Sequence, residues 1–197
     1  MGLFDKIFGK KDIEESSNQS PPKVPLGTTT ELLDEDQFWK LIQRTISSSD
    51  GSYERQQAEL KQALLELDAY SILKFDNRFR KHRGDAYNWD LWGVAYIMNG
   101  GCSDDCFSDF RGWLIGQGKE LYYKALSNSE SVVELSYEEG VDDWEGLSYV
   151  AMEAYQEKQG SRMPIGFQEN FEISGESWEE EGDDLENRFP RVWKKWW

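Results

Sequence analysis

Apolar residues recur along most of the chain at spacings of three and four, the pattern typical of amphipathic α-helices. Three early segments show this pattern. The first covers residues 34–47 and begins at Asp34, the second follows Ser52, and the third extends to about His82. Asp34 and Ser52 are polar residues that can cap a helix. Residues 144–159 repeat the pattern. The period-two alternation of half-buried strands nowhere persists, so the pattern predicts an all-α fold.

The most apolar part of the chain is residues 89–115, which read W-D-L-W-G-V-A-Y-I-M-N-G-G-C-S-D-D-C-F-S-D-F-R-G-W-L-I. Its first ten residues are apolar on nearly every side, which predicts a short buried helix. The glycines at 100–101 should end that helix, because glycine tolerates the left-handed conformation found at helix C-termini. Ser103 is a good N-cap for a second helix, whose dipole Asp104 and Asp105 would stabilise. We therefore expect two core helices joined by a tight turn.

This stretch resembles the signature of a bacterial family of uncharacterised domains, the domain-of-unknown-function family numbered 4240. The resemblance extends from the run D-E-D-Q-F-W at residues 34–39 to Tyr155, with a looser match at residues 189–191. Cys106 stands where such relatives are expected to vary, so the resemblance supports no role that needs both cysteines. It implies a helical domain over these residues, and it brings no activity, cofactor or partner with it.

The composition divides the chain into an amphipathic segment at residues 1–11, a flexible Ser/Pro/Thr linker at 12–32, a helical domain at 33–160, and an acidic arm with an aromatic end at 161–197. Between residues 169 and 186 there are nine acidic side chains and no basic ones, which is typical of a solvated arm. The last ten residues include three Trp and a Phe. We expect this end to pack back on the single multi-helix domain; the alternative is an exposed peptide that docks on another protein.

The net charge is −16, because 38 acidic residues face 22 basic ones. This balance argues against a nucleic-acid partner, which requires a basic surface, and it favours a basic protein partner. The abundant aromatic residues mainly indicate an aromatic core, although some Trp side chains could line a recognition surface. One basic cluster stands out in the domain, and it should pair with acidic neighbours or contact an anion or acidic partner: Arg78, Arg80, Lys81 and Arg83.

Cys102 and Cys106 follow no secretory signal, so we expect two reduced thiols in a cytoplasmic protein. The single histidine, His82, lies between basic residues and should be solvated; zinc sites built from several histidines are excluded. The chain has no Walker loop, no G-x-G-x-x-G, no G-x-S-x-G and no C-x-x-C motif. We predict no metal and no cofactor.

The candidate binding residues surround the central turn: Trp89, Asp90, Trp92, Asn99, Cys102, Asp104, Asp105 and Arg111. Neighbouring carboxylates can share a divalent metal, but helix-start electrostatics explain Asp104 and Asp105 better. Arg111 could pair with Asp90 or Asp104 and so hold the two helices in register. Cys102, next to a helix N-terminus, should have some thiolate character.

The sequence thus predicts a non-enzymatic, cytoplasmic protein-binding module, one version of which is an acidic, immunity-type neutraliser of a basic partner protein. One alternative is a carboxylate-metal or thiol-dependent enzyme at residues 100–105, which requires Asp90, Asp104, Asp105 and Cys102 to converge in one open pocket. Another is a peripheral membrane adaptor that makes weak contact with a membrane surface through residues 1–11. The oligomeric state cannot be read from the sequence.

Overall fold

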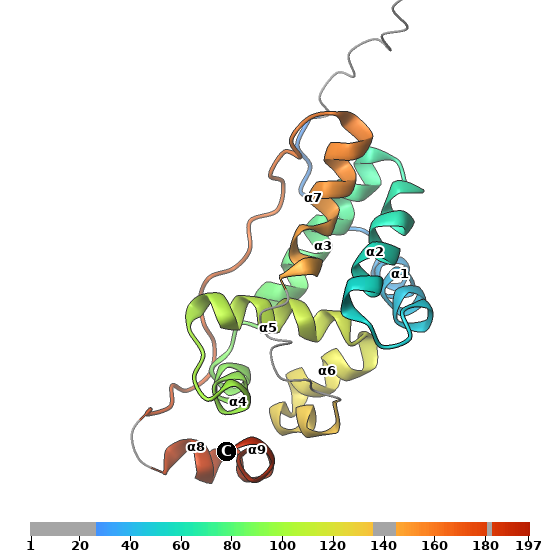
Figure 1. Cartoon of the computed structure of the whole chain (residues 1–197). Helices are drawn as coiled ribbons and strands as arrows, with labels where there is room; N and C mark the ends of the chain where they lie inside the picture. Colours follow the sequence, from blue (N-terminus) through green and yellow to red (C-terminus); the bar gives the residue numbers. More distant parts are fainter. Residues whose placement is uncertain (1–26, 136–144, 181–182) are drawn as a thin grey trace, which may run out of the picture.

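The protein is a set of packed helices, and the computed structural model describes residues 27–135, 145–180 and 183–197 (Figure 1). No β-strand occurs in these three segments, which confirms the all-α prediction. The amphipathic segment 1–11, most of the linker 12–32 and residues 136–144 of the predicted helical domain lie outside the described residues. The helices are α1 Glu35–Ser48, α2 Tyr53–Leu65, α3 Ala69–Asp85, α4 Trp89–Asn99, α5 Asp104–Gly116, α6 Lys119–Ser127, the 3-10 helix η1 Ser129–Glu134, α7 Gly146–Gln159, α8 Asp184–Arg188 and α9 Pro190–Trp196.

The first three helices begin at polar capping residues. The side chains of Asp34, Ser52 and Asp68 each accept a hydrogen bond from the backbone amide three residues further on. Each bond satisfies an amide that has no partner inside its own helix. The sequence predicted the first two of these caps, and the helices start where it placed them.

The helices form one core. In Figure 1, α2, α3 and α7 lie together on one side of α5, while α4 and α6 lie on its other side. The largest side chains buried between them include Phe38, Phe75, Phe110, Trp113 and Tyr155, each at most 1 % exposed. Full burial of one such large apolar side chain contributes roughly 1.5–3 kcal/mol, so this core is the main source of stability. None of the described helices has the length and apolar character needed to cross a bilayer.

The C-terminal end packs back on the domain, as the sequence predicted. Leu185, Phe189 and Val192 are buried, and α9 lies against α4 and η1. Gly93 of α4 makes this contact possible: a Cβ atom there would lie 2.6 Å from the Phe189 ring and 3.1 Å from Leu185. The absent side chain lets the C-terminal helices reach the α4 backbone.

Residues 161–180, here called the strap, run in an extended conformation from α7 along the outside of the domain to the C-terminal helices (Figure 1). The Phe167 amide donates to Asn77 Oδ1 of α3 at 2.9 Å. Further along, Ser174 forms an isolated parallel bridge with Asn88. Trp178 Nε1 then donates to the backbone carbonyl of α4's first residue at 3.0 Å. The strap therefore follows α3 and the α3–α4 connection.

Replacing Gly93 with alanine should displace the C-terminal helices, because the new methyl group would overlap the Phe189 ring. We expect a loss of about 1–3 kcal/mol in the free energy of unfolding, typical of overpacking, together with faster proteolysis of residues 184–197. Urea denaturation and limited proteolysis measure the two effects. Gly27→Ala is the control, because no atom lies within 4 Å of its added Cβ. A protected C-terminus in the Gly93 variant would contradict the packing described.

Candidate functional site

The turn between α4 and α5 has the caps that the sequence predicted. Gly100 adopts the left-handed conformation at φ 63°, and the Gly101 amide donates to the Tyr96 carbonyl at 2.9 Å. This geometry satisfies carbonyls that α4 leaves free at its C-terminus. Ser103 then caps α5 by accepting from the Cys106 amide at 3.3 Å.

The two cysteines of the turn form a disulfide bond, so the prediction of two reduced thiols is wrong. Cys102 lies just before α5 and Cys106 lies in its first turn, which places their Cα atoms 5.4 Å apart, a normal separation for a disulfide. Trp92 Nε1 donates to the Cys102 carbonyl at 2.9 Å, and Asn99 Nδ2 donates to Cys106 Sγ at 3.2 Å. The two hydrogen bonds tie α4 to the turn and to the first turn of α5, and the bonded sulfurs are not available as thiolate nucleophiles.

The predicted acidic residues do not converge. Asp104 and Asp105 lie exposed in the first turn of α5, where their negative charges interact favourably with the positive end of the helix dipole. Asp90 lies at the opposite end of α4, roughly 14 Å away at the rise of an α-helix, and it pairs with Arg188 at 2.5 Å. Within the part of the chain that the structure describes, no group of three or more His, Cys, Asp or Glu side chains could hold a metal ion.

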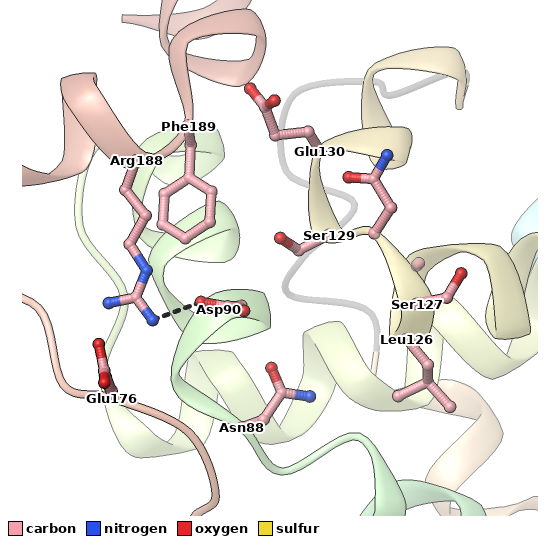
Figure 2. A pocket seen from close by; sticks show the side chains of 11 residues that line it. Asn88, Asp90, Leu126, Ser127, Ser129, Glu130, Glu176, Arg188 and Phe189 are labelled. Carbon is pink, nitrogen blue, oxygen red and sulfur yellow. Dashed lines mark hydrogen bonds and ion pairs between the residues drawn. The ribbon is translucent and has the colours of Figure 1, made fainter.

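A polar pocket of about 350 Å³ lies beside Asp90, between α4, the α6–η1 segment and the end of α8 (Figure 2). Figure 2 shows the ion pair of Asp90 and Arg188 on one wall, with Ser129 and Glu130 opposite. Neither Cys102 nor the two aspartates of α5 line this pocket. The arrangement that the enzyme alternative requires is therefore not found here.

The indoles of α4 form an aromatic stack. Trp89 and Trp92 lie parallel with ring centroids 5.4 Å apart, and Trp92 stacks on Phe107 of α5 at 5.1 Å. Trp178 of the strap packs edge-on against Trp89 at 5.9 Å. Both indoles are half-buried, and their ring contacts hold the strap and α5 against α4.

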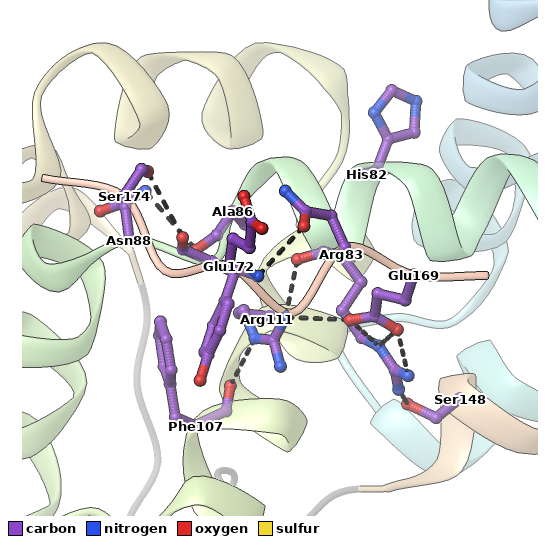
Figure 3. A network of polar contacts seen from close by, with 12 residues as sticks. His82, Arg83, Ala86, Asn88, Phe107, Arg111, Ser148, Glu169, Glu172 and Ser174 are labelled. Atoms are coloured by element: carbon purple, nitrogen blue, oxygen red, sulfur yellow. Dashed lines mark hydrogen bonds and ion pairs between the residues drawn. The ribbon is translucent and has the colours of Figure 1, made fainter.

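Arg111 does not pair with Asp90 or Asp104 as predicted. It is buried, and its Nη1 donates to Glu169 of the strap at 2.9 Å (Figure 3). The same Nη1 donates to the Arg83 carbonyl at 2.9 Å. The correction has a simple cause: Arg111 comes two turns into α5, on its buried side, whereas the aspartates of the turn face solvent.

Glu169 is the centre of this network, and its side chain is only 1 % exposed. Arg83 of α3 donates from Nε to both carboxylate oxygens, at 3.0 and 2.8 Å, while Arg111 donates to one of them (Figure 3). Burial lowers the pKa of Arg111, and the charge of Glu169 opposes that shift. Sequence reasoning missed this site because Glu169 reads as the first member of a solvated acidic run. The only signal was the basic cluster that contains Arg83.

A cavity of about 230 Å³ opens beside Arg83, between α3, α5 and α7. Its polar lining consists of Asp76, Arg80, Arg83, Ser108, Asp109, Ser148 and Tyr149. Arg80 contacts the buried Asp76 carboxylate at 2.6 Å. Burial raises the pKa of Asp76, and the charge of Arg80 opposes that shift. Asp76 is thus hydrogen-bonded to Arg80, and its charge also interacts with that of Arg83.

A family model described as a protein of unknown function (DUF4240) matches residues 33–157. The chain belongs to this family. No curated protein and no solved structure matches it. The matched DUF4240 domain contains α1 to α7 up to residue 157 and includes both Arg83 and Arg111. Glu169, which neutralises them, comes from the strap outside the matched region.

His82 of the DUF4240 domain is buried at 2 % exposure, so the prediction of a solvated histidine is wrong. Its ring packs among Phe38, Trp39 and Tyr122, at centroid distances of 4.9–5.3 Å. Burial lowers its pKa to about 4, and the charge of Arg78 adds to this shift. The basic neighbours in the sequence point to other sides of α3, while His82 faces the core.

Replacing Glu169 with glutamine should destabilise the protein, because the buried Arg111 and the partly buried Arg83 would both lose the carboxylate that they contact. Breaking a buried ion pair in this way costs about 3–5 kcal/mol, and urea denaturation would measure it. Glu172→Gln is the matched control on the same strap, since Glu172 is exposed and its loss should stay within about 0.5 kcal/mol. Equal effects of the two substitutions would show that the buried network contributes little.

The free energy of unfolding should decrease as the pH is lowered, because His82 is buried in its neutral form. The folded pKa of about 4 lies below the unfolded value of about 6.5, so the unfolded chain binds a proton first as pH falls. The stability is therefore fully present above about pH 6.5 and declines towards pH 4, by up to about 3 kcal/mol. Urea denaturation at several pH values measures the slope. His82→Phe should flatten it in this window; an unchanged slope would exclude His82 as its source.

Proposed function

We propose that the chain is a protein-binding module that recognises a basic partner protein through the turn surface, defined as Gly100, Ser103, Asp104 and Asp105. The observation that carries the proposal is the exposure of two adjacent carboxylates on a turn held by a helix cap at each side and a disulfide. A rigid acidic surface binds with little loss of conformational entropy, which favours recognition.

The two aspartates differ from many other exposed carboxylates of the domain. Within the described residues no ion pair involves Asp104 or Asp105, whereas other acidic side chains already contact a cation of this chain. Such pairs include Asp36 with Lys119, Glu66 with Arg44, Asp85 with Lys81 and Glu134 with Lys124. Asp104 and Asp105 are thus available to a cation from outside, and the net charge of −16 would speed the approach of a basic protein.

An immunity-type neutraliser is the specific form of this proposal, because a basic toxic protein is the kind of partner that an acidic surface would occupy. A cytoplasmic location belongs to the same proposal. The glycine, Ser103 and Trp92 contacts hold the turn beside the disulfide, so the shape of the acidic surface does not depend on the disulfide alone.

The test compares two variants of equal charge. Asp104→Asn/Asp105→Asn removes the carboxylates of the turn surface, while Glu59→Gln/Glu120→Gln removes two exposed carboxylates from α2 and α6. A basic protein captured from the source cell is purified, and its affinity for each variant is measured by calorimetry at two salt concentrations. We expect about a tenfold loss for the first variant, or 1.4 kcal/mol, and a much smaller loss for the second. Equal losses would place recognition elsewhere.

A further inference from the structure

Two arginines of the DUF4240 domain form an anion-binding site that the domain itself does not fill. The side chains of Arg83 and Arg111 are 17 % and 5 % exposed, and both donate to the same carboxylate. A buried and a partly buried cation this close repel each other and are costly without an anion. Asp76, the acidic side chain nearby on α3, is already paired with Arg80. The one carboxylate that both arginines contact in this structure comes from outside residues 33–157, because the strap supplies it.

The domain also binds the backbone of the strap. Asn77 accepts from the Phe167 amide at 2.9 Å. The Ser174 amide donates to the Tyr87 carbonyl at 3.1 Å, and Ser174 accepts from the Trp89 amide at 3.0 Å. Backbone hydrogen bonds combined with one side-chain pocket are the usual way in which proteins recognise an extended peptide.

Gly84 completes this groove. A Cβ atom at this position would lie 3.3 Å from the backbone nitrogen of Asn170, so the absent side chain lets the strap backbone approach α3 next to Glu169. Arg83, one residue before Gly84, also lines the cavity between α3, α5 and α7. The groove thus contains a carboxylate pocket, a close backbone approach and backbone partners on both sides.

The strap fills this groove with little apolar burial. Ile165 and Phe171, on either side of Glu169, are 73 % and 74 % exposed. Apolar contact therefore contributes little to the hold of this segment, which depends on the carboxylate and on the backbone hydrogen bonds. A second peptide with the same features could compete for the same contacts.

We propose that the groove, lined by Asn77, Arg83, Gly84, Tyr87 and Arg111, is a binding site for an extended acidic peptide of a partner protein, and that the strap occupies it in cis. The incoming peptide places one Glu side chain between the two arginines and forms the backbone bonds of residues 167 and 174. The strap then acts as an internal competitor, and its displacement opens the site. This proposal is independent of the turn surface.

The test uses the full chain with Glu169→Ala, which removes the carboxylate of the internal competitor. A labelled peptide of residues 164–176 is titrated into this variant and into the unaltered protein, with fluorescence anisotropy as the readout. We expect the variant to bind the peptide at least tenfold more tightly than the unaltered protein. The same peptide with Glu169→Gln should bind at least tenfold more weakly to the variant, and Arg111→Met/Glu169→Ala should lose the preference for the Glu peptide. Equal binding of the two peptides would overturn the proposal.

A second measurement needs no destabilised variant. Hydrogen exchange of the unaltered protein is followed at residues 164–176 while unlabelled, acetylated peptide is added in excess. Displacement should speed exchange of the strap amides several-fold, and the Gln peptide should not. Acetate at equal ionic strength tests whether a small carboxylate is enough. If acetate speeds the exchange as strongly as the Glu peptide does, the site binds a free carboxylate and the peptide proposal fails. Unchanged exchange with every addition would also overturn it.

Discussion

The buried carboxylate of Glu169 between Arg83 and Arg111 is the interaction on which the arrangement of the chain beyond α7 depends. It joins α3, α5 and the strap at one point, with 1 % of the acidic side chain exposed. A buried ion pair adds little net stability when compared with apolar packing, but it is costly to break on one side only. Its effect here is therefore on specificity: only a segment that brings a carboxylate to this point can lie along α3.

The C-terminal helices follow from that placement. Once Glu169 and Ser174 hold the strap, Trp178 reaches Trp89, and the chain arrives at α4 where Gly93 leaves room for Phe189. Burial of Leu185, Phe189 and Val192 then adds apolar stabilisation, which is greater than the strap obtains around Glu169, where Ile165 and Phe171 are exposed. The acidic arm is thus held by one ion-pair network near its start and by apolar packing at its end.

The turn surface and the groove have opposite electrostatic character. At the turn, Asp104 and Asp105 face solvent without an ion pair in the described residues, which suits a cationic partner. In the groove, two neighbouring arginines bind a carboxylate. A chain with 38 acidic and 22 basic residues can supply that anion from its own C-terminal arm, because acidic side chains are in excess there. The same excess leaves carboxylates free elsewhere for recognition.

Local features could be read from the sequence, because caps and helical periodicity act over three or four residues. Asp34, Ser52 and Ser103 cap helices where expected, and Gly100 ends α4 in the left-handed conformation. The partners of charged and buried groups were decided by the tertiary structure alone. Arg111 meets Glu169 across 58 residues, Asp90 meets Arg188 across 98, and His82 turns to the core despite its basic neighbours. Sequence spacing carries no information about such contacts, since the packing of distant helices decides which ions meet and which ring is removed from water.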